Sequence, residues 1–155
     1  AVYVANNGKY RSRSIEEVFH AEFSSILLRN RAKDFDEAAW RAINPPDFAY
    51  RGNGVQAIKK GEAGQRLDSE LNKAGFVIEY AESSLENDFN AIAGRLFMGD
   101  DAFWRVAEQY PKVMAKVDLA IAFYAKLDAS FTKEKFLSLR QPEPRTSDNN
   151  PIRAP

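Results

Sequence analysis

One carboxylate in this sequence stands where an apolar side chain is expected. Glu22 lies in the stretch from 14 to 30, SIEEVFHAEFSSILLRN, which predicts a helix. At about 100° per residue, it falls on one line with Ile15, Phe19 and Ile26. Burying an isolated ionised carboxylate costs on the order of several kcal/mol, so it needs a metal, a cation, a hydrogen-bond network or a raised pKa. Glu22 is therefore the first candidate for a catalytic residue.

The residues next to Glu22 have the spacing of a zinc-protease helix but lack its imidazoles. The HExxH motif places two histidines four residues apart on a helix, so that both bind one metal while the glutamate between them activates a water. Ala21 and Ser25 occupy these two positions here. The single histidine, His20, projects more than about 150° away from Glu22 around the helix, so it replaces neither imidazole without a local distortion.

A structural role is the alternative for each polar candidate. Glu22 can accept hydrogen bonds within a core polar network. A lone histidine such as His20 is more often a core or boundary residue than a metal ligand. Glu86 and Asp88 lie in the first turn of a later predicted helix, where acidic side chains are favoured by the exposed amides. The residues alone leave the choice between structure and chemistry open.

The elements that would position these residues are predicted to be helices. Ser14 with Glu17, and Ser83 with Glu86, have the capping-box spacing that marks a helix start. Pro45 is expected to stop a helix. Helices are expected at 14–30, 34–43, 55–62, 67–73, 83–98, 100–109, from 111 onwards and at 132–139, with 74–82 irregular. At 155 residues, the chain is therefore expected to form one mainly α domain.

The two ends of the chain are expected to differ from this helical core. Alternating residues and the Asn7-Gly8 pair predict a short β-hairpin within 2–11. Residues 141–155, QPEPRTSDNNPIRAP, are rich in proline and polar side chains and predict a flexible tail. The helical domain is thus assigned to residues 1–140.

Composition excludes several classes of function. Lysine plus arginine equals aspartate plus glutamate at 22 each, which argues against a nucleic-acid-binding protein. The sequence has no cysteine, so thiol catalysis, disulfides and cysteine-ligated zinc are excluded for it. No apolar run approaches the ~18 residues of a membrane span.

Four stretches, taken together and in order, resemble one protein family. They read EEVFHAEFSSILLRN, INPPDFAYRGNG, AGFVIEYAESSLENDFNAIAGRLF and FWRVAEQYPKVMAKVDLAIAFYAKLD. These stretches are similar to the zinc-binding metallopeptidase-like lipoproteins of Bacteroidetes, over about residues 14 to 140. The resemblance implies a gluzincin-type helical core, in which the first helix supplies HExxH and the helix from Ser83 or Ser84 supplies an acidic third ligand.

Carried over by position, the resemblance gives these residues roles. Glu22 matches the general base, and His20 matches the histidine just before the motif. The acidic third ligand falls on Asp88 or Glu86, and Asp88 is preferred because it flanks the apolar face of its helix. Ala21 and Ser25 stand where the family has its metal-binding imidazoles, so this sequence departs from the family at two of three expected ligands.

Two functions follow from the resemblance and its departures. The first is a noncatalytic, degenerate member that acts as an exported binding or structural module. The second is an active metal-dependent peptide hydrolase with Glu22 as base and zinc held by His20 and by Asp88 or Glu86. The resemblance also implies a peptide or protein ligand and a periplasmic or outer-membrane lipoprotein, anchored only through a lipid outside this segment. Substrate and oligomeric state are left open.

Overall fold

A computed structural model of the protein describes residues 15–52 and 54–141. In order, its elements are α1 (Ile15–Asn30), η1 (Ala32–Asp34), α2 (Glu37–Ile43), α3 (Gly54–Lys60), α4 (Ser69–Ala74), η2 (Glu79–Ser83), α5 (Leu85–Met98), α6 (Asp101–Gln109), α7 (Pro111–Leu127) and α8 (Lys133–Ser138), where η marks a short 3-10 helix. The prediction of a mainly α single domain is confirmed. The hairpin predicted within 2–11 and nearly all of the predicted tail lie outside the described residues.

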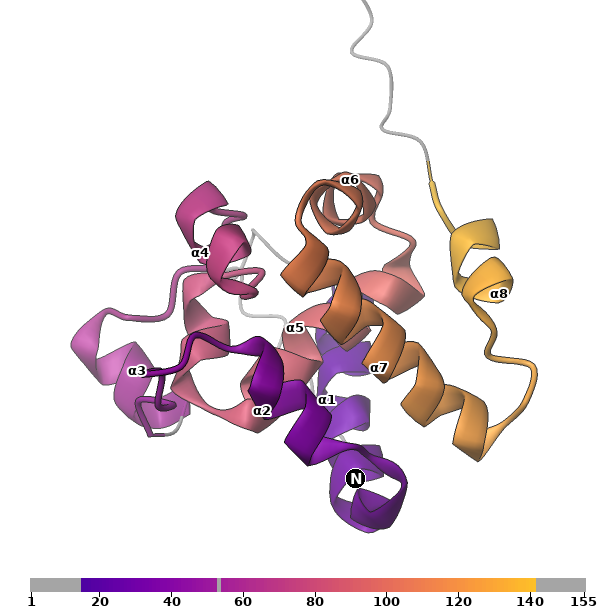
Figure 1. The fold of residues 1–155 in the computed structure, drawn as a ribbon, viewed down its shortest axis with the longest axis horizontal. Coiled ribbons are helices and arrows are strands. Elements are labelled where there is room, and N and C mark those ends of the chain that lie inside the picture. The colour runs from indigo at the N-terminus through magenta and orange to yellow at the C-terminus, as the bar shows by residue number, and fades with distance from the viewer. Residues whose placement is uncertain (1–14, 53, 142–155) are drawn as a thin grey trace, which may run out of the picture.

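Helix α5 is the centre of the fold. Figure 1 shows α5 in the middle of the molecule, and α1, α7 and η2 all contact it. Its large apolar residues Phe89, Ile92 and Leu96 are fully buried, and small residues on its other faces are buried too. A helix buried on most of its circumference is expected at the centre of a domain rather than at its surface.

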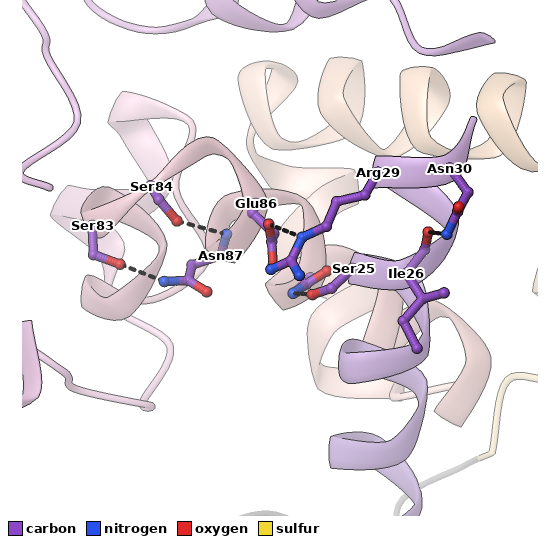
Figure 2. Close-up of polar contacts among 9 residues, drawn as sticks. Ser25, Ile26, Arg29, Asn30, Ser83, Ser84, Glu86 and Asn87 are labelled. Atoms are coloured by element: carbon purple, nitrogen blue, oxygen red, sulfur yellow. Dashed lines mark hydrogen bonds and ion pairs between the residues drawn. The ribbon is translucent and has the colours of Figure 1, made fainter. Parts of the chain in front are cut away.

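The ends of α5 are set by a serine and a glycine. Ser84 is the N-cap, since its hydroxyl accepts a hydrogen bond from the Asn87 amide at 3.1 Å (Figure 2). The capping box predicted for Ser83 and Glu86 is therefore wrong by one residue. Gly99, with a φ of 61°, ends the helix in the left-handed conformation.

Helix α1 buries a different face from the predicted one. Its buried residues are Ala21, Ser24, Ser25 and Leu28, all on the side toward α5. A Cβ built on Gly94 of α5 would lie only 3.1 Å from the carbonyl oxygen of Glu17. The two helices approach this closely because small side chains line both of them.

The apolar line on which Glu22 was placed does not face the core. Ile15 and Phe19 are 52% and 44% exposed, and Glu22 is also exposed. Glu22 is therefore not a buried carboxylate. The physical reason is steric, because a phenylalanine-rich face would hold the helix axes too far apart to match Gly94.

Helix α7 contacts α5 directly, whereas α2, α4 and α6 pack on α7, and α3 packs on η2. The helix predicted at 34–43 begins later, after the turn of η1, and the Asp36 carboxylate caps α2 by accepting from the Ala39 amide at 2.9 Å. The stretch 74–82 contains no strand, and its Phe76, Val77 and Ile78 are fully buried beside η2. Helix α7 buries an apolar stripe at helical spacing, namely Val113, Val117, Ala120, Ile121 and Tyr124.

The end of the described chain returns to the start of α6. The Gln141 amide donates to the Gly99 carbonyl at 2.9 Å, and Arg140 forms ion pairs with Asp101 and Glu108. Figure 1 shows α8 at the edge of the molecule, beside α7. Among the described helices, none has the length and apolar character required to cross a membrane.

Candidate functional site

A buried pair of opposite charges lies at the heart of the domain. Asp88 of α5 and Lys116 of α7 each have 0% exposed side-chain area. Lys116 Nζ lies 2.7 Å from Asp88 Oδ2. A buried pair at this distance repays its desolvation only when further hydrogen bonds satisfy the two groups.

Two aromatic donors complete the site around Asp88. The Trp40 indole Nε1 and the Tyr50 hydroxyl donate to the same Oδ2, at 2.9 and 2.8 Å. Lys116 Nζ also lies 4.0 Å from the ring centroid of Phe76, a cation–π distance. One carboxylate oxygen thus joins α2, the loop after it, α5 and α7. We name Asp88, Lys116, Trp40 and Tyr50 the Asp88 centre.

Burial dominates the electrostatics of the Asp88 centre. It raises the pKa of Asp88, while Lys116, Tyr50 and Trp40 oppose that change by stabilising the carboxylate. Burial also lowers the pKa of Lys116, with Asp88 opposing, and it raises the pKa of Tyr50. Because the carboxylate and the ammonium are both closed off from solvent, the arrangement fits a structural role better than contact with a substrate.

The structure places the predicted catalytic Glu22 apart from the Asp88 centre. Its side chain is exposed on the outer side of α1, whereas Asp88 is fully buried. His20 is partly buried and stacks on Phe97, with ring centroids 4.8 Å apart and planes 9° from parallel. Burial lowers the pKa of the His20 imidazole, and Glu16, whose carboxylate is 4.0 Å away, opposes this change.

Glu86, the alternative third ligand, is used in an ion pair. Both of its carboxylate oxygens accept from the Arg29 guanidinium, at 2.6 and 3.0 Å. Figure 2 shows this bidentate contact joining α1 to α5. A carboxylate paired in this fork geometry already has its charge neutralised.

The two positions that carry imidazoles in HExxH face the interior between helices. Ala21 is 4% and Ser25 is 5% exposed. Ser25 Oγ accepts from Asn90 Nδ2 at 2.6 Å, and the neighbouring Ser24 Oγ lies 2.6 Å from the Tyr124 hydroxyl. Ser25 is therefore used in a hydrogen bond to α5, and its neighbour Ser24 in one to α7, on the side of α1 where Ala21 is also buried.

The residues present do not fit a zinc site. Zinc needs about four nitrogen, sulfur or oxygen ligands converging on one point. Asp88 Oδ2 is already used by three donors, one of them a cation. Within residues 15–52 and 54–141, no three histidine, aspartate or glutamate side chains are grouped so that they could hold a metal.

Sequence reasoning missed three of the four residues in the Asp88 centre as polar partners. Trp40 and Tyr50 are of the residue type that usually fills the core of a small helical domain, and nothing in the sequence marks their donor groups as partners of a carboxylate. Lys116 did give one, because it lies on the apolar stripe of α7 between Val113 and Ala120. A charged side chain on a buried apolar face needs a partner. In this protein that side chain is Lys116 and not Glu22.

Comparisons of this chain with protein-family models, with curated proteins and with solved structures found no match.

Proposed function

We propose that this chain is a noncatalytic, metallopeptidase-like helical domain that serves as a binding or structural module of an exported protein. The observation that carries the proposal is the Asp88 centre. The carboxylate that the resemblance makes the preferred zinc ligand is instead neutralised by Lys116 at 2.7 Å and closed off from solvent.

Two further observations support the same proposal. Glu22, the counterpart of the general base, lies on the exposed side of α1, while Ala21 and Ser25 point toward the interior. A general base must lie within hydrogen-bond reach of a water held by the metal ligands. Export and a lipid anchor outside this segment belong to the proposal through the resemblance alone.

Metal analysis of the purified protein tests the proposal. We expect less than stoichiometric zinc after dialysis and no change in Tm when zinc or a chelator is added, because a ligand that binds only the folded state raises Tm. Glu22→Gln is then expected to leave the zinc content and the Tm unchanged, as Glu37→Gln does. Glu37 is an exposed glutamate of α2 and serves as the control. One zinc per chain that is lost in His20→Gln or Asp88→Asn but kept in Glu37→Gln, together with a peptidase activity that Glu22→Gln abolishes, would establish the hydrolase alternative instead.

A further inference from the structure

The outer face of α1 presents an apolar surface with an acidic rim. Ile15, Phe19 and Phe23 are 52%, 44% and 42% exposed, and the rings of Phe19 and Phe23 stack with centroids 5.9 Å apart. The exposed carboxylates of Glu16 and Glu22 lie beside them on the same helix. We name these five residues the α1 surface.

Helix α3 presents a second apolar surface, and its charge is opposite. Val55 and Ile58 are 63% and 57% exposed, while Ala57 faces inward and is buried. Lys59 and Lys60 follow directly and are exposed. Lys59 lies beside Val55 on the same face of the helix, whereas Lys60 projects away from it. We name Val55, Ile58 and Lys59 the α3 surface. The large exposed apolar side chains of the described residues lie on these two surfaces, apart from Leu137 on α8.

We propose that the α1 surface of one copy of this chain binds the α3 surface of a second copy, head to tail. Apolar side chains on each surface would bury one another, and the carboxylates of Glu16 and Glu22 would meet the ammonium group of Lys59. This inference goes beyond the proposed function and holds whether or not the domain binds a metal.

Charge favours contact between an α1 surface and an α3 surface over contact between two like surfaces. In a two-fold pair of α1 surfaces, the same acidic rim would face itself, and like charges in contact are unfavourable. A pair of α3 surfaces would bring lysines together in the same way. Only the mixed contact joins opposite charges over apolar side chains.

A head-to-tail contact leaves one surface free at each end of every assembly. It therefore grows into a ring or an open chain rather than stopping at a dimer. Helix α3 has only seven residues, so the contact is small and of the weak, transient kind. We expect association that rises with protein concentration and falls with salt.

Sedimentation analysis of three variants tests the contact. Phe19→Ser with Phe23→Ser removes the apolar side chains of the α1 surface and leaves it acidic, and Ile58→Glu with Lys59→Glu disables the α3 surface, so the two disabled surfaces carry like charges and do not bind each other. Leu137→Lys is the matched control, since Leu137 is 38% exposed on α8, outside both surfaces. Far-ultraviolet circular dichroism confirms that each variant keeps its helices.

The expected result is a pattern that only a head-to-tail contact produces. Each disabled variant alone stays monomeric at concentrations where the wild type and Leu137→Lys associate. An equimolar mixture of the two disabled variants forms a dimer and nothing larger, because one intact α1 surface then meets one intact α3 surface.

Three outcomes overturn the inference. One is a wild type that stays monomeric at every concentration. The second is association that is lost in the α1 variant but kept in the α3 variant, which identifies a symmetric α1 pair. The third is a mixture of the two variants that remains monomeric, which separates a different partner from a second copy.

Discussion

At the scale of single residues, His20 reports directly on the environment of α1. The imidazole is held against Phe97, and its burial lowers the pKa below the ordinary value of 6.5. Because His20 is the only histidine of the chain, its titration gives one unambiguous nuclear magnetic resonance signal. We expect that signal to titrate with a midpoint below 6.5, and Glu16→Gln to lower the midpoint further, since Glu16 stabilises the imidazolium.

The lowered pKa of His20 also makes stability depend on pH. The folded protein binds this proton less readily than the unfolded chain, so the contribution of His20 is present above pH 6.5 and is lost as pH falls through the folded-state pKa. The chemical-denaturation midpoint of the wild type is expected to fall as the pH is lowered below 6.5. His20→Gln should remove the share of this fall that comes from His20. A midpoint at or above 6.5 for the imidazole would contradict the stacked, partly buried position.

Lys116 and Asp88 should be strongly coupled in a double-mutant cycle. Lys116→Met leaves a buried carboxylate without its cation and is expected to lower the free energy of unfolding by about 3–5 kcal/mol. Adding Asp88→Asn removes the stranded charge, so the double variant should be more stable than Lys116→Met alone. Because burial raises the pKa of Asp88, Lys116→Met should be least destabilised at acid pH, where the carboxyl group is protonated.

An exposed ion pair provides the control for that cycle. Lys73 Nζ lies 2.6 Å from the Glu70 carboxylate, but the two side chains are 60% and 78% exposed. Lys73→Met is expected to leave the free energy of unfolding nearly unchanged in urea denaturation, because solvent screens an exposed ion pair. If Lys116→Met and Lys73→Met lowered the free energy of unfolding equally, the buried pair of the Asp88 centre would not stabilise the fold.

Residue types alone indicated which side chains carry charge, but not which charges are buried. Glu22 and Lys116 both fall on apolar lines of their helices, yet Glu22 is exposed and Lys116 is fully buried. The difference arises because the inward side of α1 is chosen by the fit to α5, whereas α7 is oriented by its own apolar stripe. Periodicity finds a charge on a stripe, but the partner helix decides whether that stripe is buried.

At the scale of elements, the contact of α1 with α5 depends on small residues. The site of a Cβ on Gly94 is 3.1 Å from the Glu17 carbonyl oxygen and 3.6 Å from Ala21 Cβ. Gly94→Val would force the helices apart, and overpacking of this kind costs about 1–3 kcal/mol. We expect a loss of at least that size in the free energy of unfolding, measured by chemical denaturation.

A valine at an exposed helical position separates this steric cost from helix propensity. Ala38→Val on the exposed side of α2 should cost only about 0.5 kcal/mol. If Gly94→Val were no more costly than Ala38→Val, the close approach of α1 and α5 would be wrong.

Helix positions were predicted better than helix orientation. Caps, prolines and glycines act locally, so the starts and ends of α5 and α6 and the start of α7 followed from the sequence within about two residues. The orientation of α1 depends on Gly94, which lies more than 60 residues away from Ala21 in the chain. No local pattern encodes that long-range match.

At the scale of the whole molecule, the candidate site and the closure of the chain both depend on α5. Asp88, in the first half of α5, bonds to Trp40 of α2 and Lys116 of α7. The carbonyl of Gly99, directly after α5, accepts a hydrogen bond from Gln141 in the segment after α8. Helices α1 and α5 contact each other, and α1 buries Ala21 and Ser25. The motif carried over from the family contains no counterpart of Lys116, so the resemblance did not predict Lys116 at the centre.

The closure at Gly99 gives a prediction for the whole fold. Gly99 and Gly61 both have positive φ, at 61° and 76°, so alanine at either position is expected to cost about 1–2 kcal/mol in backbone strain. The two sites differ in their surroundings. A Cβ at Gly99 would lie 1.9 Å from the Leu139 carbonyl oxygen, whereas a Cβ at Gly61 would meet nothing within 4 Å.

Gly99→Ala should therefore do more than strain one turn. It must displace the backbone of Leu139, which breaks the bond between the Gln141 amide and the Gly99 carbonyl and loosens α8, whose Phe136 is fully buried. We expect Gly99→Ala to lower the free energy of unfolding by more than Gly61→Ala and to speed amide hydrogen exchange in α8, whereas Gly61→Ala leaves α8 protected. Equal exchange of α8 in the two variants would show that the segment after α8 does not hold this corner of the molecule together.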